Sequence, residues 1–317
     1  MKKSLAMILA LCVLFLTALP VYAEDVPKLN VVTTIFPPYD FVRQIAGDAV
    51  ELTILLPPGT ESHSFEPRPQ DILRIQNADV FIYVGGQTDV WVDRILNSMD
   101  VSNIALLPML SMVDAVEEEI VEGMEHSDDH DEEDHDDDHD EIELDEHVWT
   151  SPENAKLIVN VIVETLSALD SRNADTYRAN ADAYIDELDA LDAAFQAVVD
   201  RSARTTVLFG DRFPFRYMAN AYGLTYYAAF PGCATETEAS AATIATLIDK
   251  VRAEKIPVVF SIEFSNGKIA DVICESTGAV RLEMHSCHNL SKTDFDTGLG
   301  YLELMYRNVE ALKEALW

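Results

Sequence analysis

Positive charge is scarce in this sequence. Its 317 residues contain 22 Lys and Arg against 56 Asp and Glu, so the formal net charge at pH 7 is −34. No Lys or Arg occurs from Ile95 to Ala155, and that stretch holds 22 of the acidic residues. A chain of this charge repels nucleic acid, because phosphate binding needs clustered cations. We therefore expect no nucleic-acid partner.

Long apolar runs are also scarce, and the one near the N-terminus has the features of an export signal. Two lysines precede the apolar segment Leu5–Leu19, and Val21–Ala23 offers a small-residue cleavage site. This order is typical of a signal peptide, which we predict over residues 1–23. No later segment reaches the roughly 18–20 apolar residues of a membrane-spanning helix. The mature chain is thus expected outside the cytoplasm, in the periplasm or at the cell surface.

Cysteine is too rare here for a disulfide scaffold. The four cysteines include Cys12 inside the predicted signal, where a lipid anchor fits poorly because a leucine precedes it and an apolar run follows. Its removal leaves an odd number in an oxidising compartment, namely Cys233, Cys274 and Cys287. One disulfide and one buried thiol is the simple expectation, with Cys233–Cys287 as the predicted pair.

Short β-branched runs alternate with helical patterns in both halves of the chain. The predicted strands are Leu29–Ile35, Glu51–Leu56, Val80–Val84, Ile104–Leu107, Thr205–Phe209, Leu224–Ala228, Pro257–Ile262 and Ala279–Glu283. The predicted helices between and after them are Tyr39–Ala46, Gln70–Asn77, Val90–Ser98, Phe213–Ala221, Ala239–Ala253, Lys268–Ser276 and Gly300–Leu316. Such alternation indicates an α/β fold with two lobes, each a four-stranded, mostly parallel sheet with flanking helices.

A helical stretch separates the two series. Ser151 followed by Pro152 is a helix start, with serine as N-cap and proline in the first turn. A second, longer pattern predicts a rigid linking helix over 173–202. The domains expected are therefore an N-terminal lobe over 24–172 and a C-terminal lobe over 203–317.

Histidines lie where ligands bind in such folds, just past the ends of predicted strands. His63 stands in a loop rich in proline and glycine, directly after a strand. His147 follows two carboxylates at a helix entry, a setting that can orient an imidazole through its second nitrogen. His285 is the first residue of a ligand-rich loop, Glu283–His288, after the last strand. These positions make His63, His147 and His285 candidate metal ligands.

An acidic run, Glu125–Glu141, precedes His147 and contains 12 acids and four histidines. Its charge predicts a disordered loop over about 114–144. Imidazoles among carboxylates suit weak, multiple capture of a divalent transition metal. The auxiliary metal-capturing residues predicted here are His126, His130, His135 and His139.

Hydrolase and nucleotide-binding signatures are absent from the sequence. It contains no GxSxG elbow, no HExxH and no GxxxxGK[ST]. We therefore expect a binding protein and not an enzyme, with a secreted metallohydrolase as the alternative from another class.

Three segments together resemble the zinc/manganese solute-binding proteins of ABC transporters, the cluster A-I metal-receptor family. They are Pro58–Pro67, Val84–Gly86 with Trp91, and Glu146–Ala155 after the acidic His-rich insert. The resemblance implies two α/β lobes bridged by a long helix, with one metal ion between them, and a monomer that delivers the ion to an ABC permease with its ATPase.

The same resemblance implies that His63 and His147 are the first two ligands. A third histidine is usual after the first strand of the second lobe, but here the stretch Phe209–Phe215 has none. The family's last ligand, a carboxylate, falls near His285. We therefore expect His285 to supply the imidazole of the second lobe, with Asp211, Glu283 or His288 as the fourth ligand. Three imidazoles and one oxygen favour Zn²⁺ over Mn²⁺, which prefers more oxygen ligands. The prediction is thus a zinc receptor, with a manganese receptor or a metal-dependent surface adhesin as alternatives on the same scaffold.

Overall fold

The computed structural model describes residues 27–61, 65–124, 143–234 and 238–317. The predicted signal peptide with Cys12, the ligand candidate His63 and the auxiliary histidines His126, His130, His135 and His139 lie outside these residues. Among the described residues, no helix is both long and apolar enough to cross a bilayer.

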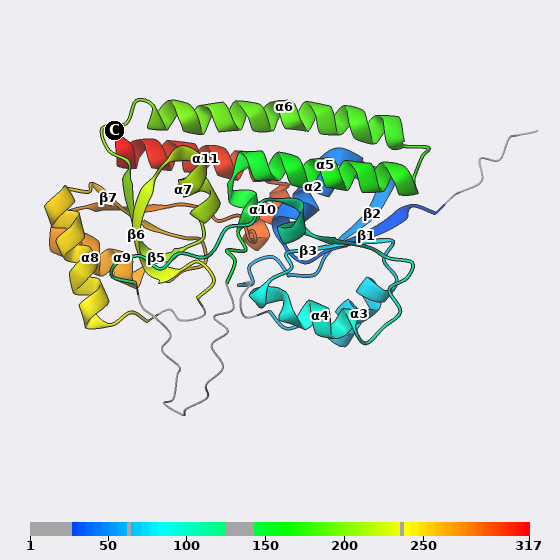
Figure 1. Ribbon diagram of the computed structural model, residues 1–317, viewed down its shortest axis with the longest axis horizontal. Helices are drawn as coiled ribbons and strands as arrows, with labels where there is room; N and C mark the ends of the chain where they lie inside the picture. The colour runs from blue at the N-terminus through cyan, green and yellow to red at the C-terminus, as the bar shows by residue number, and fades with distance from the viewer. Residues whose placement is uncertain (1–26, 62–64, 125–142, 235–237) are drawn as a thin grey trace, which may run out of the picture.

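Two four-stranded sheets form the framework, and every strand pairing in them is parallel (Figure 1). The first has the order β2-β1-β3-β4, and the second the order β6-β5-β7-β8. The strands of the first sheet are β1 (Leu29–Thr33), β2 (Val50–Ile54), β3 (Val80–Tyr83) and β4 (Ala105–Pro108). Those of the second are β5 (Thr206–Phe213), β6 (Thr225–Pro231), β7 (Val258–Ser261) and β8 (Val280–Glu283). The predicted two-lobed α/β fold is confirmed.

Helices cover both sheets. The first lobe has α2 (Phe36–Ala46), α3 (Pro69–Gln76) and α4 (Val90–Leu96). The second has α7 (Arg216–Tyr222), α8 (Ala241–Glu254), α9 (Lys268–Thr277), α10 (Lys292–Thr297) and α11 (Tyr301–Leu316). Between the lobes in sequence come α5 (Pro152–Leu169) and α6 (Ala174–Val199). Short 3₁₀ turns occupy Gly47–Ala49, Gln87–Asp89, Met109–Met112 and Val148–Thr150.

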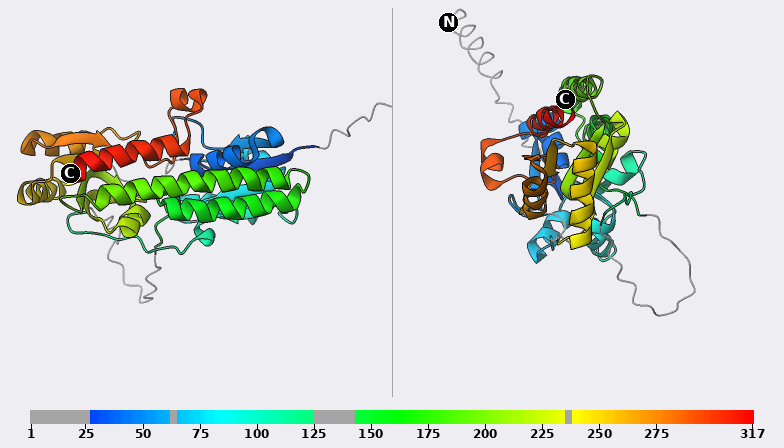
Figure 2. Two further views of the ribbon diagram at one scale, coloured as in Figure 1. Left: turned by 90° about the horizontal axis from the view of Figure 1, so that it is seen from above. Right: turned by 90° about the vertical axis from the view of Figure 1, so that its left-hand side faces the viewer.

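The helix α6 runs along the long axis of the molecule, with α5 beside the part over the first lobe and α11 beside the part over the second (Figures 1 and 2). The predicted start of α5 is confirmed, since Ser151 is its N-cap and accepts a hydrogen bond from the Asn154 amide. The α6 stripe of Tyr184, Leu188 and Leu191 is buried, in one hydrophobic core with residues of both lobes. In the first half of α6 the side-chain amide of Asn180 donates to the Ile45 carbonyl, 2.9 Å away, near the end of α2.

The end of β5 and the start of α7 differ from the sequence-based prediction of elements, and α10 is not predicted. The strand β5 continues through Phe213, where a helix is predicted, because a bulge after Phe209 lets the strand pair with β6 again at Arg212. The Phe213 ring then stacks on Tyr226 at 3.7 Å between centroids, and α7 starts only at Arg216, beyond Pro214.

The predicted disulfide Cys233–Cys287 is wrong for this structure, in which Cys233, Cys274 and Cys287 are free thiols. Cys287 is fully buried, and its Sγ donates to the His285 carbonyl of its own loop. Cys233 lies after β6, where its backbone amide donates to the Glu118 carboxylate at 2.9 Å. Cys233 and Cys287 therefore make separate contacts and do not form a disulfide.

Both ends of the predicted disordered loop, 114–124 and 143–144, belong to the described residues, and 125–142 lies outside them. Glu117 and Leu144 form an isolated antiparallel bridge. The Glu118 amide donates to the Glu143 carbonyl, and the Asp145 amide to the Val116 carbonyl, both at 2.9 Å. The two ends of the insert are therefore joined to each other next to His147.

Candidate metal centre

The candidate site lies among loops that follow the strands of both sheets, where parallel α/β sheets bind their ligands. One of these loops, residues 284–290 after β8, connects the two lobes directly. The His288 carbonyl accepts from the Phe36 amide at 3.0 Å, and the Leu290 carbonyl accepts from the Gly59 amide at 2.7 Å. The last loop of the second lobe is thus docked on the start of α2 and on the predicted His63 loop.

His147 is fully buried at the start of the 3₁₀ turn that precedes α5. Its Nδ1 lies 3.1 Å from Asp145 Oδ1, and its backbone amide donates to the same oxygen at 2.9 Å. A carboxylate at Nδ1 fixes the ring's orientation and turns Nε2 to the opposite edge. This is the arrangement that protein sites use to present an imidazole to a metal ion.

Gly232 leaves the space that the His147 ring occupies. A Cβ atom at position 232 would lie 2.9 Å from Cε1 and 3.1 Å from Nδ1 of His147. It would also lie 3.0 Å from the Phe213 carbonyl oxygen, which belongs to backbone. Only glycine fits here without moving the histidine.

His288 is the histidine that the structure brings against His147. The two ring centroids are 4.8 Å apart and the rings are nearly perpendicular, at 88°. The Trp149 ring also packs edge-on against His288 at 4.8 Å. The indole Nε1 of Trp149 donates to the Ser286 carbonyl at 2.7 Å, which fixes the Trp149 ring on the loop that carries His288.

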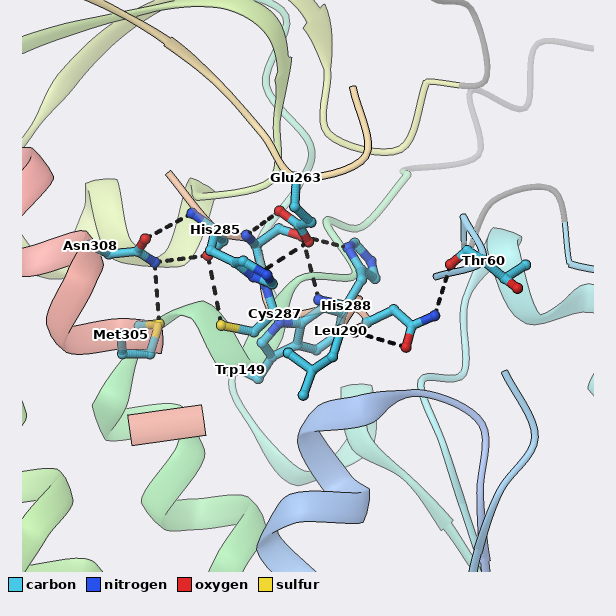
Figure 3. A network of polar contacts seen from close by, with 11 residues as sticks. Thr60, Trp149, Glu263, His285, Cys287, His288, Leu290, Met305 and Asn308 are labelled. Atoms are coloured by element: carbon cyan, nitrogen blue, oxygen red, sulfur yellow. Dashed lines mark hydrogen bonds and ion pairs between the residues drawn. The ribbon is translucent and has the colours of Figure 1, made fainter. Parts of the chain in front are cut away.

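Ser286 and Glu263 fix the His288 ring on its Nδ1 side (Figure 3). The Ser286 hydroxyl lies 3.0 Å from His288 Nδ1 and donates to Glu263 Oε1, while the Ser286 amide donates to Glu263 Oε2 at 2.7 Å. A buried carboxylate therefore reaches His288 Nδ1 through a hydroxyl. His147 and His288 are oriented by the same principle, directly in one case and through serine in the other.

His285, the predicted second-lobe ligand, is engaged within its own loop. Its Nδ1 accepts from the Cys287 amide at 3.0 Å and lies 3.7 Å from Glu263 Oε1. Its backbone amide and carbonyl are both bound by the Asn308 side chain on α11. Between the two histidines, Cys287 has φ +65°, a left-handed conformation that is rare for residues other than glycine. That turn separates the directions of His285 and His288.

The other fourth-ligand candidates are placed less favourably. Asp211 is buried near the end of β5, where it accepts from the amides of Arg212 at 2.9 Å and Ile262 at 3.4 Å. Burial is the main cause that raises the pKa of Asp211, with these hydrogen bonds opposing it. Glu283 ends β8 with an exposed side chain. Sequence analysis did not identify Glu263, although its position directly after the predicted strand Pro257–Ile262 made it a candidate.

Buried carboxylates surround the histidine pair. Asp89, Asp145, Glu146 and Glu263 are each less than 9% exposed. Burial raises the pKa of Asp89 to about 7, and Glu146 adds to this effect through like charge, although the amides of Val84 and Gly85 donate to the carboxylate. This concentration of acid favours a cation at the site and disfavours an anion.

The described residues do not by themselves complete a metal site. Within 27–61, 65–124, 143–234 and 238–317, no group of three or more His, Cys, Asp or Glu is placed to hold one ion. The ligand set His63, His147 and His285 therefore stays a prediction, with His288 as the described partner of His147.

Comparisons with known proteins give a family match and relatives of similar sequence. The family model described as "Zinc-uptake complex component A periplasmic" matches residues 31–315. The zinc-binding lipoprotein AdcA of Streptococcus pneumoniae serotype 4 is 32% identical over 99% of this chain, which spans only 61% of that relative. The high-affinity zinc uptake system protein ZnuA of Bacillus subtilis is 32% identical, with 91% of this chain and 88% of the relative covered.

A solved structure extends the likeness to three dimensions. The crystal structure of the Zn(II)-bound ZnuA-like domain of Streptococcus pneumoniae AdcA matches with a TM-score of 0.73 and 29% identity, covering 91% of this chain and 99% of that domain. With the parallel sheets and the histidine pair described above, these matches establish that the chain belongs to the ZnuA family of zinc-uptake components.

Proposed function

We propose that this protein captures Zn²⁺ between its two lobes outside the cytoplasm and delivers it to an ABC permease driven by an ATPase. It acts as a monomeric receptor without catalysis. The observation that carries this proposal is the perpendicular His147–His288 pair, contributed by the loop before α5 and the loop after β8. Export depends on the predicted signal peptide at 1–23.

The proposed ligand set is His63, His147 and His288, with a carboxylate or water completing a tetrahedral shell. Two described imidazoles backed by carboxylates suit Zn²⁺, which takes nitrogen ligands in tetrahedral geometry. Mn²⁺ prefers sites richer in oxygen, so zinc is the favoured cargo. His285 moves from ligand to positioning residue in this proposal, because its Nδ1 already accepts from the Cys287 amide. The histidines His126, His130, His135 and His139 are proposed to capture further zinc weakly.

Calorimetric titration with Zn²⁺ and Mn²⁺ tests the ligand set. His63→Ala, His147→Ala and His288→Ala are each expected to weaken zinc binding by on the order of 100-fold or more, since each removes one ligand. The matched control is His285→Ala, which removes an imidazole from the same loop as His288 and is expected to cost much less. A larger loss of zinc affinity for His285→Ala than for His288→Ala would show that His285, and not His288, is the ligand from this loop. Wild-type protein that binds no zinc would end the proposal.

A further inference from the structure

An ion pair joins the two lobes beside the candidate site. Arg212, near the end of β5, places Nη1 3.1 Å from Oε1 of Glu61 in the loop that follows β2. The same Nη1 donates to the Ala234 carbonyl at 3.3 Å, so the guanidinium is anchored within the second lobe as well. Arg212 lies in the stretch where the family resemblance leads one to expect a histidine.

The pair is better protected from solvent than an ordinary surface salt bridge. The Arg212 side chain is 8% exposed and that of Glu61 is 33% exposed. Exposed ion pairs contribute little because water screens them, whereas charge-assisted hydrogen bonds in partly buried positions are stronger. Removing one partner also leaves a buried guanidinium without its carboxylate, which adds to the cost.

The loop that carries Glu61 makes three more contacts with the second lobe. The Asn289 side-chain amide donates to the carbonyls of Pro57 and Thr60, both at 2.8 Å, and the Gly59 amide donates to the Leu290 carbonyl. Asn289 and Leu290 directly follow His288. The loop 57–61 is therefore fastened to the second lobe from Pro57 to Thr60 by Asn289 and Leu290, and at Glu61 by Arg212.

We propose that Arg212 is a positioning residue that fastens the loop 57–61 to the second lobe through Glu61 in the metal-free protein. The Arg212–Glu61 pair connects the two lobes without the zinc ion. When zinc arrives, less loop freedom remains to be lost, and preorganisation of this kind strengthens binding. This consequence for affinity rests on the proposed zinc-binding function, whereas the fastening itself does not.

Hydrogen exchange in the metal-free mature chain tests the fastening directly. The Gly59 amide is the reporter, because its acceptor belongs to the other lobe. Arg212→Ala and Glu61→Ala are each expected to speed its exchange by about three- to tenfold, as expected for loss of a charge-assisted hydrogen bond. The double variant is expected to be no faster than either single variant, and Arg212→Lys to restore part of the protection. The control is Arg281→Ala, which removes an exposed pair with Asp271 elsewhere on the second lobe and should leave Gly59 unchanged.

The zinc dissociation rate gives the second readout. Glu61→Ala is expected to raise it by about three- to tenfold with an unchanged melting temperature, because Glu61 is a partly exposed loop residue. Unchanged exchange at Gly59 in both single variants, or additive effects in the double variant, would overturn the proposal. The proposed function fails separately, by absence of zinc binding in the wild-type protein, and the exchange experiment still decides the fastening in that case.

Discussion

Both described histidines of the site obtain their orientation from a carboxylate on the far side of the ring. Asp145 contacts His147 Nδ1 directly, and Glu263 reaches His288 Nδ1 through the Ser286 hydroxyl. Each ring is thereby held with its other nitrogen facing away from the carboxylate. Two rings set in this way, 4.8 Å apart, spend little conformational freedom on binding an ion.

Gly232 offers a test of this geometry that leaves every ligand in place. We expect Gly232→Ala to weaken zinc binding by about tenfold or more, because the added Cβ would meet the His147 ring and the Phe213 carbonyl. Calorimetric titration measures the loss. The matched control is Gly223→Ala, whose Cβ would meet no atom within 4 Å but whose φ of +66° strains any residue with a side chain. That variant should lose about 1 kcal/mol of stability and keep its zinc affinity, and equal zinc affinities for all three proteins would contradict the account.

Sequence reasoning predicted part of this hydrogen-bond geometry. His147 was identified by its neighbouring carboxylates, and Asp145 does contact it. The loop after the last strand was identified as well, but the choice of His285 within it depends on the left-handed turn at Cys287, which no sequence pattern encodes. Glu263 and Arg212 act through partners 23 and 151 residues away, which spacing along the chain cannot indicate.

At the scale of elements, local signals predicted most helices and strands. The Ser-Pro start of α5 and the apolar stripe of α6 were both read correctly. The short helix α10 was missed because it buries no residue and so has no apolar stripe. The extension of β5 to Phe213 was missed because it depends on a bulge and on stacking against Tyr226.

The segment 116–122, which we call the acidic strap, was predicted to be disordered from its charge, but it makes defined contacts in the structure. It leads from the first lobe to the second, where Glu119 contacts Arg216 at 3.3 Å and the Tyr226 hydroxyl at 3.1 Å. Glu122 pairs with Lys250 on α8 at 2.7 Å. A run of like charges repels itself in isolation, but here Arg216 and Lys250 of the second lobe offset part of the charge, and the Tyr226 hydroxyl donates a hydrogen bond to it. The contact is tertiary and therefore invisible to composition.

Removing one charge of the acidic strap should weaken the backbone hydrogen bonds that join the strap to residues 143–145. We expect Glu119→Gln to speed hydrogen exchange of the Glu118 and Asp145 amides about two- to fivefold, the range for loss of a partly exposed ion pair. These amides report on that connection because the Glu118 amide donates to the Glu143 carbonyl and the Asp145 amide donates to the Val116 carbonyl. The control is Glu310→Gln, which removes an exposed pair with Lys313 on α11. Equal exchange in Glu119→Gln and wild type would mean that the hydroxyl and backbone contacts hold the strap without the charge.

At the scale of the whole molecule, the two lobes share one hydrophobic core. The cluster that contains Val31 of β1 also contains Phe209 of β5, through buried residues of α5, α6 and α11. In Figure 2 the helix α6 spans both lobes, packed on α5 at one part and on α11 at the other, so the lobes are connected along α6 and not at a single hinge. Opening the lobes widely would expose part of this core, at about 25 cal/mol for each Å² of apolar surface. Small tilts cost far less.

Zinc should therefore change the shape of the protein little. We expect the radius of gyration from X-ray scattering to differ by less than about 1 Å between metal-free and zinc-loaded protein, since packed helices shift by only about 1–2 Å. The variant Ala190→Pro introduces a kink at an exposed position of α6 without changing core residues, and should enlarge the difference. Ala190→Ser at the same position is the matched control and should behave as wild type. A change of several Å in the wild-type protein would mean that the shared core does not restrain the lobes, and the receptor would then close by a hinge.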